Sequence, residues 1–158
     1  MTDPLVRAEA LAQRFREIAD TRMRGLPVVN PALEVEAIAF APQYLGADSH
    51  SGLLGILITP WSMNLVWLPD DAGSTPVEGA TCEYQLGGER LSFIGAVDEQ
   101  IGPYQSCSLF SPMFEFRDPQ SARDMARQVL AALRRPSVEQ PANPSRRNLF
   151  GRLAGIRQ

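Results

Sequence analysis

The stretch GLLGILITPWSMNLVWLP, Gly52 to Pro69, decides the fold of this chain. Its first half, residues 52–59, is a short apolar run rich in branched side chains, which favours a buried strand over a helix. Its second half, residues 62–68, is another such run and ends at Pro69. Two strands joined by so short a turn favour antiparallel pairing. The stretch therefore predicts the centre of an antiparallel sheet.

Working outward, further segments alternate between apolar and polar residues at the period of a strand. These are residues 35–41, where the alternation is weak, 81–86, 90–98 and 103–110. The pair Gly87-Gly88 between two of them is typical of a tight hairpin turn. The last segment stops at Ser111-Pro112. The chain therefore predicts about five or six strands.

Two amphipathic helices are expected at the ends of this strand region. The first covers residues 3–22, with Asp3 as a cap, Pro4 at the first helical position and an apolar face made by Leu11, Phe15 and Ile18. The second covers residues 119–133, with Asp118 as a cap, Pro119 at the first helical position and an apolar face made by Met125, Val129 and Ala132 or Leu133. Together these elements predict an α+β fold, in which both helices cover one face of a mostly antiparallel sheet.

The composition changes after the second helix. Residues 134–158 hold six Arg and one Glu, a local charge of +5, together with three Pro and few apolar residues. We therefore expect a globular domain over residues 1–133, followed by a mobile Arg-rich arm over residues 134–158.

The overall charge and hydropathy exclude several classes of protein. The formal net charge of −3 gives no general attraction to nucleic acid or to an anionic membrane. The first 19 residues are too charged for a signal peptide, and the longest apolar run, near residues 53–58, is far shorter than the ~20 residues of a membrane helix. These features predict a cytoplasmic protein with no direct insertion into membranes.

The residues that usually carry chemistry are scarce. Two cysteines, Cys82 and Cys107, and one histidine, His50, cannot supply the four ligands of a structural zinc site, and there is no CxxC motif. We therefore expect no metal, no cofactor and no enzymatic activity. His50 lies in a segment expected to be a loop. Cys107 leaves three alternatives open, namely a core cysteine, a thiol at a partner interface, or the nucleophile of a cysteine-dependent enzyme or redox accessory protein.

Aromatic residues and methionines suit a surface that binds another protein. In the second strand of the opening stretch they lie on one face together with Leu65, and that face either packs in the core or binds a partner. Residues 110–116 hold four more such side chains around a proline, and they either cap the sheet edge or form an interaction patch. The residues concerned are Trp61, Met63, Trp67, Phe110, Met113, Phe114 and Phe116.

Four segments together resemble the HybE/HupJ family of nickel–iron hydrogenase assembly chaperones. They are LITPWSMNLVWLP (residues 57–69), YQSCSLFSPM (104–113), the helix that begins at 119, and SRRNLFGR (145–152). The first two are specific in combination, and the order and spacing match over nearly the whole chain.

The resemblance implies a non-catalytic cytoplasmic chaperone without a cofactor. Such a protein binds an immature hydrogenase subunit until cofactor insertion and assembly are complete, and it meets other maturation factors. The small subunit with its twin-arginine export signal is one proposed client, and the large subunit is another. Some relatives carry a rubredoxin domain, but this chain lacks the CxxC pairs of one.

The resemblance also suggests which residues meet the client. The candidates for partner binding are Trp61, Met63, Asn64, Trp67, Tyr104, Cys107, Ser108, Pro112, Met113 and Phe114. The arm contributes Arg146, Arg147, Leu149 and Phe150, within a string that is itself similar to a twin-arginine motif. The arm is either a plain basic tail or a segment that occupies the chaperone's own groove until a client displaces it.

Overall fold

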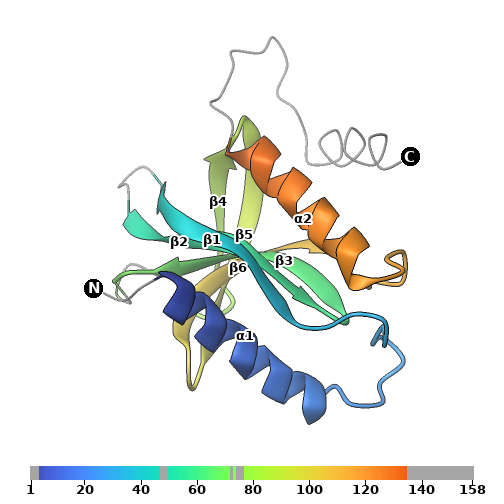
Figure 1. The fold of residues 1–158 in the computed structure, drawn as a ribbon. Helices are drawn as coiled ribbons and strands as arrows, with labels where there is room; N and C mark the ends of the chain where they lie inside the picture. Colours follow the sequence, from blue (N-terminus) through green and yellow to red (C-terminus); the bar gives the residue numbers. More distant parts are fainter. Residues whose placement is uncertain (1–3, 47–49, 72, 74–76, 135–158) are drawn as a thin grey trace.

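The computed structural model describes residues 4–46, 50–71, 73 and 77–134. Two helices enclose six strands, as Figure 1 shows. Their bounds are α1 Pro4–Asp20, β1 Glu36–Leu45, β2 His50–Thr59, β3 Ser62–Pro69, β4 Thr81–Leu86, β5 Glu89–Asp98, β6 Gly102–Phe110 and α2 Pro119–Leu133. The strands form one antiparallel sheet in the order β1-β2-β3-β6-β5-β4. The predicted α+β class with helices at both ends is confirmed.

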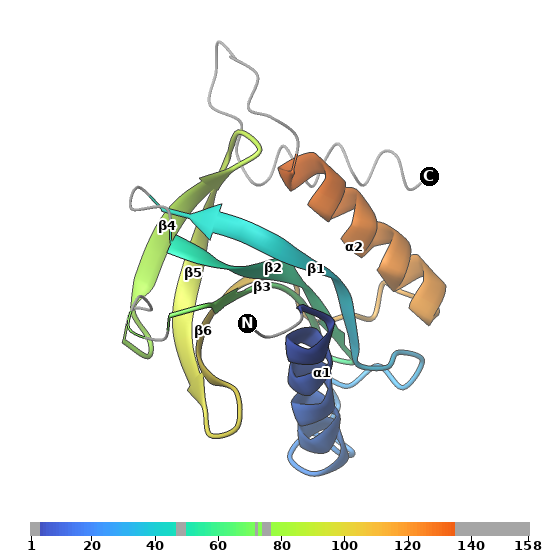
Figure 2. The same ribbon diagram turned by 60° about the vertical axis from the view of Figure 1, so that its left-hand side comes forward.

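The two helices lie on opposite faces of this sheet, so the prediction that both cover one face was wrong (Figure 2). The reason is in β2, which is apolar on both faces. Leu54, Ile56 and Ile58 belong to the core that α2 closes, whereas Leu53 and Leu57 belong to the core under α1. A strand that is buried on both faces is a continuous apolar run, and each face requires a cover.

The larger core lies between the curled sheet and α2. Trp67, Phe93 and Phe116 are fully buried there against the buried face of α2, which consists of Ala122, Met125, Ala126, Val129, Leu130 and Leu133. The curl brings the two edge strands, β1 and β4, close together. Gly46, which follows β1, lies so near Tyr84 of β4 that a Cβ added to Gly46 would be 3.4 Å from the Tyr84 ring. The sheet thus wraps around the side chains that α2 covers.

The predicted cap of α2 and the predicted β4–β5 turn are confirmed. Asp118 caps α2 by accepting a hydrogen bond of 2.8 Å from the backbone N–H of Ser121, and Pro119 occupies the first turn. Gly87 in the β4–β5 turn has a φ of +59°, and a Cβ there would lie 2.8 Å from the Cα of Leu133. The hairpin tip therefore packs directly on the end of α2, which only glycine permits.

Three local predictions need correction. The strand expected over residues 35–41 extends to Leu45, because Pro42 is tolerated on an edge strand. The helix expected over residues 3–22 ends at Asp20, and residue 3 lies outside the described residues. His50 was expected in a loop but opens β2, paired with Leu45 and exposed.

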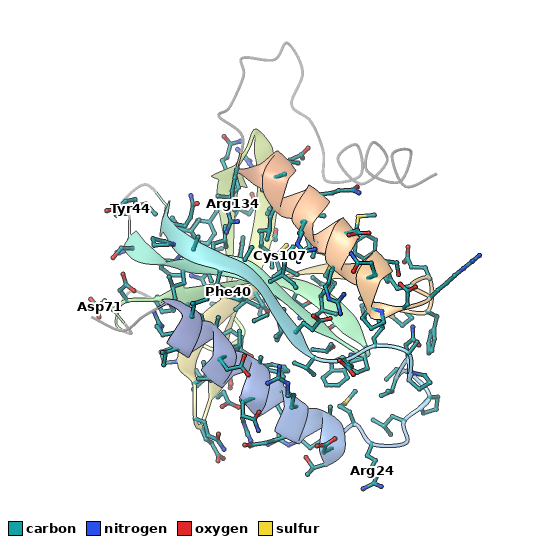
Figure 3. The ribbon with its side chains drawn as sticks, viewed as in Figure 1. Arg24, Phe40, Tyr44, Asp71, Cys107 and Arg134 are labelled. Atoms are coloured by element: carbon teal, nitrogen blue, oxygen red, sulfur yellow. The ribbon has the colours of Figure 1, made fainter. Side chains whose placement is uncertain are left out.

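β1 carries a bulge that α2 stabilises. The register shifts between Ile38 and Ala41, and Ala39 has a φ of 52°, which is unusual for a residue with a side chain. Arg134, the C-terminal cap of α2, donates hydrogen bonds of 2.8 Å to the carbonyl oxygens of Ala39 and Leu54 (Figure 3). A guanidinium thus satisfies carbonyls at the point where the β1–β2 ladder is irregular.

Helix α1 is fixed to its own face of the sheet by apolar contacts and by arginines. Ala8, Leu11 and Ala12 pack on the sheet, while Phe15 and Ala19 are partly buried beside them. Arg7 donates hydrogen bonds to the Pro69 carbonyl (2.8 Å) and to Asp70 (3.2 Å) at the end of β3. Within the described residues, neither helix is long and apolar enough to cross a membrane.

The ion pair between Arg14 of α1 and Asp98 of β5 makes folding stability depend on pH. The Nε of Arg14 lies 2.9 Å from Oδ1 of Asp98, and both side chains are nearly buried. Burial raises the pKa of Asp98, but hydrogen bonds from Arg14, Gln100 and Ile101 outweigh it and hold the pKa below its ordinary value of 3.8. A carboxyl with a lowered pKa stabilises the fold above its unfolded pKa, and this contribution is lost as the pH falls through the folded pKa.

We expect Asp98→Asn to lower the free energy of unfolding at pH 7, and we expect this difference to shrink as the pH falls below 3.8. Urea denaturation at a series of pH values measures it. Glu99→Gln, which removes the neighbouring charge, is the matched control and should show no comparable difference. An equal loss for Asp98→Asn at every pH would contradict the role given to the ion pair.

Candidate functional site

Asn30 joins three separate segments at one end of the sheet. Its backbone N–H donates to the carbonyl of Pro60 (2.8 Å), in the β2–β3 turn. Its side-chain Nδ2 donates to the carbonyls of Met113 and Phe116, each at 2.9 Å, and its Oδ1 accepts from the N–H of Ala32 (3.0 Å). The side chain is buried, so these bonds are shielded from water. The two motif segments that resemble the chaperone family therefore meet on either side of Asn30.

The β2–β3 turn that carries Trp61 is held by Thr59. The Thr59 hydroxyl accepts hydrogen bonds from the N–H groups of Trp61 (3.2 Å) and Ser62 (2.9 Å) and is itself buried. A side-chain hydroxyl that accepts hydrogen bonds from the backbone N–H groups two and three residues later replaces the strand-to-strand hydrogen bonds that are missing in a turn. Trp61 is consequently held half-exposed on a rigid turn.

Trp61 lines a groove of about 730 Å³ between the end of α1, the segment before β1, and the β2–β3 turn. We call it the Trp61 groove. Its apolar wall contains Ala19, Met23, Val29, Leu33, Val35, Pro60 and Trp61, and its charged residues are Arg16, Asp20, Arg24, Glu34 and Glu36. Apolar lining with a few polar groups is typical of a binding cleft.

The electrostatics of the groove favour a cation. The C-terminal end of α1, with its partial negative charge, lies at the groove and carries Asp20 and no basic residue in its last turn. Of the two arginines, Arg16 is already engaged with Glu9 and with the Val35 carbonyl. Figure 3 shows Arg24 projecting away from the sheet. Asp20 and Glu34 form no ion pair among the described residues, although the charge of Glu34 helps to raise the pKa of Arg123, so both carboxylates can meet a positively charged ligand.

Glu36 contributes less to this field, because its Oε1 is paired with Arg123 of α2 at 2.8 Å. Its other oxygen, Oε2, is buried and accepts no hydrogen bond from the described residues. The hydrogen bond that Arg123 donates to Glu36 raises the pKa of Arg123. This pair connects the groove to α2.

Four of the ten predicted partner-binding residues are buried in the core under α2. Met63, Trp67, Cys107 and Met113 each have an exposed fraction of 1% or less. The apolar stripe of β3 therefore packs in the core, which was one of the two alternatives left open. In this conformation none of these four side chains is accessible to a client.

The other six lie in two places. Trp61, Pro112 and Phe114 are at the Asn30 end of the sheet, and Phe114 has an exposed fraction of 55%. Within residues 110–116, Met113 and Phe116 fill the core while Phe114 remains outside, and the interaction patch stays a prediction.

The remaining three, Asn64, Tyr104 and Ser108, lie on the face of the sheet that α1 partly covers. Asn64 and Ser108 are paired across β3 and β6. Tyr104 packs beside the core under α1, and burial together with Asp98 and Glu78 raises its pKa. The structure does not bring these three to the Trp61 groove. The four arm candidates, Arg146, Arg147, Leu149 and Phe150, lie outside the described residues.

Two observations concern the residues that could carry chemistry in the described part of the chain. The thiol of Cys107 is almost fully buried, so a substrate cannot reach it in this conformation. No group of three or more His, Cys, Asp or Glu side chains within the described ranges could hold a metal ion.

Sequence reasoning missed the residues that organise the groove, namely Asn30, Thr59 and the pair Asp20 and Glu34. Asn30 precedes Pro31 in a segment read as a connection, and its hydrogen-bond partners are 83 and 86 residues away. The one local signal was Thr59 before Pro60, which is typical of a turn stabilised by a side chain.

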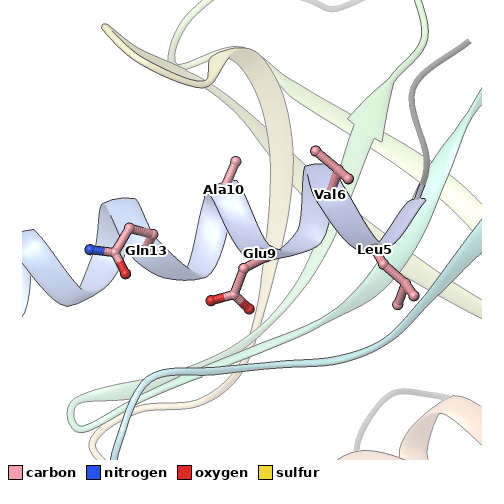
Figure 4. A pocket seen from close by; sticks show the side chains of 5 residues that line it. All are labelled: Leu5, Val6, Glu9, Ala10 and Gln13. Atoms are coloured by element: carbon pink, nitrogen blue, oxygen red, sulfur yellow. The ribbon is translucent and has the colours of Figure 1, made fainter.

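A second hollow lies along the outer face of α1. It is about 450 Å³, apolar for the most part, and lined by Leu5, Val6, Glu9, Ala10 and Gln13 (Figure 4). Val6 has an exposed fraction of 60%. This surface consists of a single helix face. Among the residues that line it, Glu9 is the charged one, whereas five charged residues line the Trp61 groove.

Comparison with known proteins gives a consistent result. The sequence pattern of the family described as "NiFe-hydrogenase assembly, chaperone, HybE" matches residues 6–152. Protein HoxT of Cupriavidus necator is 46% identical over 160 residues, which cover 92% of this chain and 89% of that protein. The hydrogenase expression/formation protein HupT of Azotobacter chroococcum is 41% identical over 148 residues, which cover 93% and 95%.

The fold is also found among solved structures. The solution structure of HybE from Escherichia coli aligns with a TM-score of 0.62, over 87% of this chain and 83% of that one. The two sequences are 21% identical, so this likeness concerns the fold.

Proposed function

Because the chain belongs to the HybE family of nickel–iron hydrogenase assembly chaperones, we propose that it binds an immature hydrogenase subunit until its cofactors are inserted and the subunits have joined. The client that the groove fits best is the small subunit, held by its twin-arginine signal. The large subunit is the alternative client, and other maturation factors are expected partners. We propose that the protein acts in the cytoplasm, before the small subunit is exported.

The observation that carries the proposal is the composition of the Trp61 groove. A twin-arginine signal presents two adjacent guanidinium groups followed by apolar residues. Arginine pairs with carboxylates in a planar, charge-assisted geometry, and Asp20 and Glu34 supply such acceptors. Trp61, Met23 and Leu33 supply an apolar and adaptable surface for the residues that follow.

Binding without catalysis is the role that this chemistry supports. An aromatic anchor in a cleft gives affinity by excluding water, and no proton or electron has to move. The cysteine-dependent alternative places its nucleophile at Cys107, and that side chain belongs to the core of the domain.

We expect Trp61→Ala to weaken binding of a synthetic small-subunit signal peptide at least tenfold, which is about 1.4 kcal/mol. Truncating a central aromatic anchor commonly costs this much or more. Isothermal titration with the full chain measures the affinity, and circular dichroism verifies that the variant is folded.

Tyr44→Ala is the matched control, because Tyr44 is an aromatic residue with 69% exposure at the other end of the β1–β2 hairpin. It should bind like the unchanged protein. The same titration with the mature small subunit, which lacks the signal, and with the large subunit identifies the client. A folded Trp61→Ala variant with unchanged affinity for every one of these would refute the groove as the binding site.

A further inference from the structure

The C-terminal arm of this chain has the chemistry that the Trp61 groove accepts. We propose that, in the free protein, residues 145–150 of the same molecule occupy the groove, so that a client must displace them. The proposal concerns the regulation of the site proposed above and rests on that site in one respect, namely that the client uses the same groove.

Charge complementarity is the first argument. Residues 134–158 carry a net charge of +5, from six Arg and one Glu, whereas the rest of the chain carries −8. Within the arm, SRRNLF places two arginines before Leu149 and Phe150, with one asparagine between the two pairs. The groove offers both kinds of partner, namely the carboxylates of Asp20 and Glu34 with the negative end of α1, and an apolar wall.

Reach is the second argument. Arg134, from which the arm starts, is fixed by its hydrogen bonds to the carbonyls of Ala39 and Leu54. Glu36, which lines the groove, is three residues before Ala39 on the same strand, a distance of about 10 Å. Residues 135–145 can span up to about 40 Å when extended. Pro60, at the groove, is six residues along β2 from Leu54, a distance of about 20 Å, so the arm is long enough to reach the groove.

The concentration effect is the third argument. A segment that a short linker tethers to its own site has an effective concentration on the order of 1 mM there. Even an arm with an intrinsic Kd near 100 μM would then occupy the groove about 90% of the time and weaken a competing client about tenfold. Weak intrinsic affinity is what a displaceable occupant requires.

The test uses the full chain with a photo-reactive benzoylphenylalanine in place of Phe150. We expect intramolecular crosslinks, identified by mass spectrometry, to Met23, Trp61 or their neighbours in the groove. The same probe at Tyr44 is the control and should not reach those residues. Crosslinks scattered over the surface, or formed mainly between molecules, would overturn the proposal.

A second measurement tests competition. Arg146→Gln with Arg147→Gln should raise the affinity for the small-subunit signal peptide about tenfold. Arg152→Gln with Arg157→Gln removes the same charge elsewhere in the arm and should change the affinity little. Equal affinities in both double variants would also overturn the proposal.

The two proposals can fail separately. If the signal peptide binds through Trp61 and the variants at Arg146 and Arg147 change nothing, the arm is not the occupant but the proposed function stands. If the crosslinks map to the groove and disappear when Arg146 and Arg147 are replaced, yet no hydrogenase subunit binds, the arm contact stands and the proposed function fails.

Discussion

Gly55→Val is expected to unfold this protein or to lower its free energy of unfolding by about 3 kcal/mol or more. Gly55 lies in β2 directly beneath Phe40 of the neighbouring strand β1. A Cβ on Gly55 would lie 2.4 Å from the Phe40 ring and 2.8 Å from the Phe40 Cα. Since one of the colliding atoms belongs to the backbone, no rotamer change removes the overlap, and β1 must separate from β2.

The measurement is urea denaturation followed by circular dichroism. Domains of this size have only about 5–15 kcal/mol of stability, so the expected loss is a large share of the total. Ser92→Val is the matched control, because it places the same side chain at an exposed strand position of β5. It should shift the midpoint little. A Gly55→Val variant with the midpoint of the unchanged protein would contradict the close approach of Phe40.

Asn30→Ala is expected to lower the free energy of unfolding, measured by urea denaturation, by about 3 kcal/mol. The change leaves the carbonyls of Met113 and Phe116 and the N–H of Ala32 without their side-chain partner. Each buried polar group that loses its partner costs about 1–3 kcal/mol. The backbone N–H of Asn30 still donates to the Pro60 carbonyl in this variant, so the loss should be concentrated in the segment from Met113 to Phe116.

Asn30→Asp separates the hydrogen bonds from the volume of the side chain. The aspartate is isosteric but directs a carboxylate at two carbonyl oxygens, so we expect a loss at pH 7 at least as large as that of Asn30→Ala. At low pH the protonated acid can donate to one carbonyl, and the difference from the unchanged protein should shrink. Asn64→Ala, at a half-buried asparagine of β3, is the control and should cost much less. Equal stability losses at positions 30 and 64 would remove Asn30 from its proposed role.

Local physics made much of the fold predictable from the sequence. The branched run of β2, the glycine pair of the β4–β5 hairpin and the Asp118-Pro119 start of α2 each encode their structure within a few residues. Periodicity and capping act over one or two turns of backbone, so a single sequence is enough to read them. The arm over residues 134–158 and its division from the domain remain predictions.

The candidate site was less predictable, because its residues are distant in sequence and chemically ordinary. Trp61 and Trp67 occur in the same apolar segment, and nothing in their spacing says that one lines a groove and the other fills the core. The difference arises because the chain leaves β2 at Pro60 and turns, so Trp61 sits in the turn while Trp67 is in β3.

By itself, then, the sequence determined the strands, the helices and the hairpin turns, since each depends on neighbouring residues. The tertiary structure alone decided that α1 and α2 lie on opposite faces, because alternation predicts two faces for β2 but does not say which helix covers each one. It alone decided that Asn30 joins the turn at Pro60 to Met113 and Phe116. Such contacts are selected by burial and by the need to satisfy buried polar groups, and those needs exist only once the chain has closed on itself.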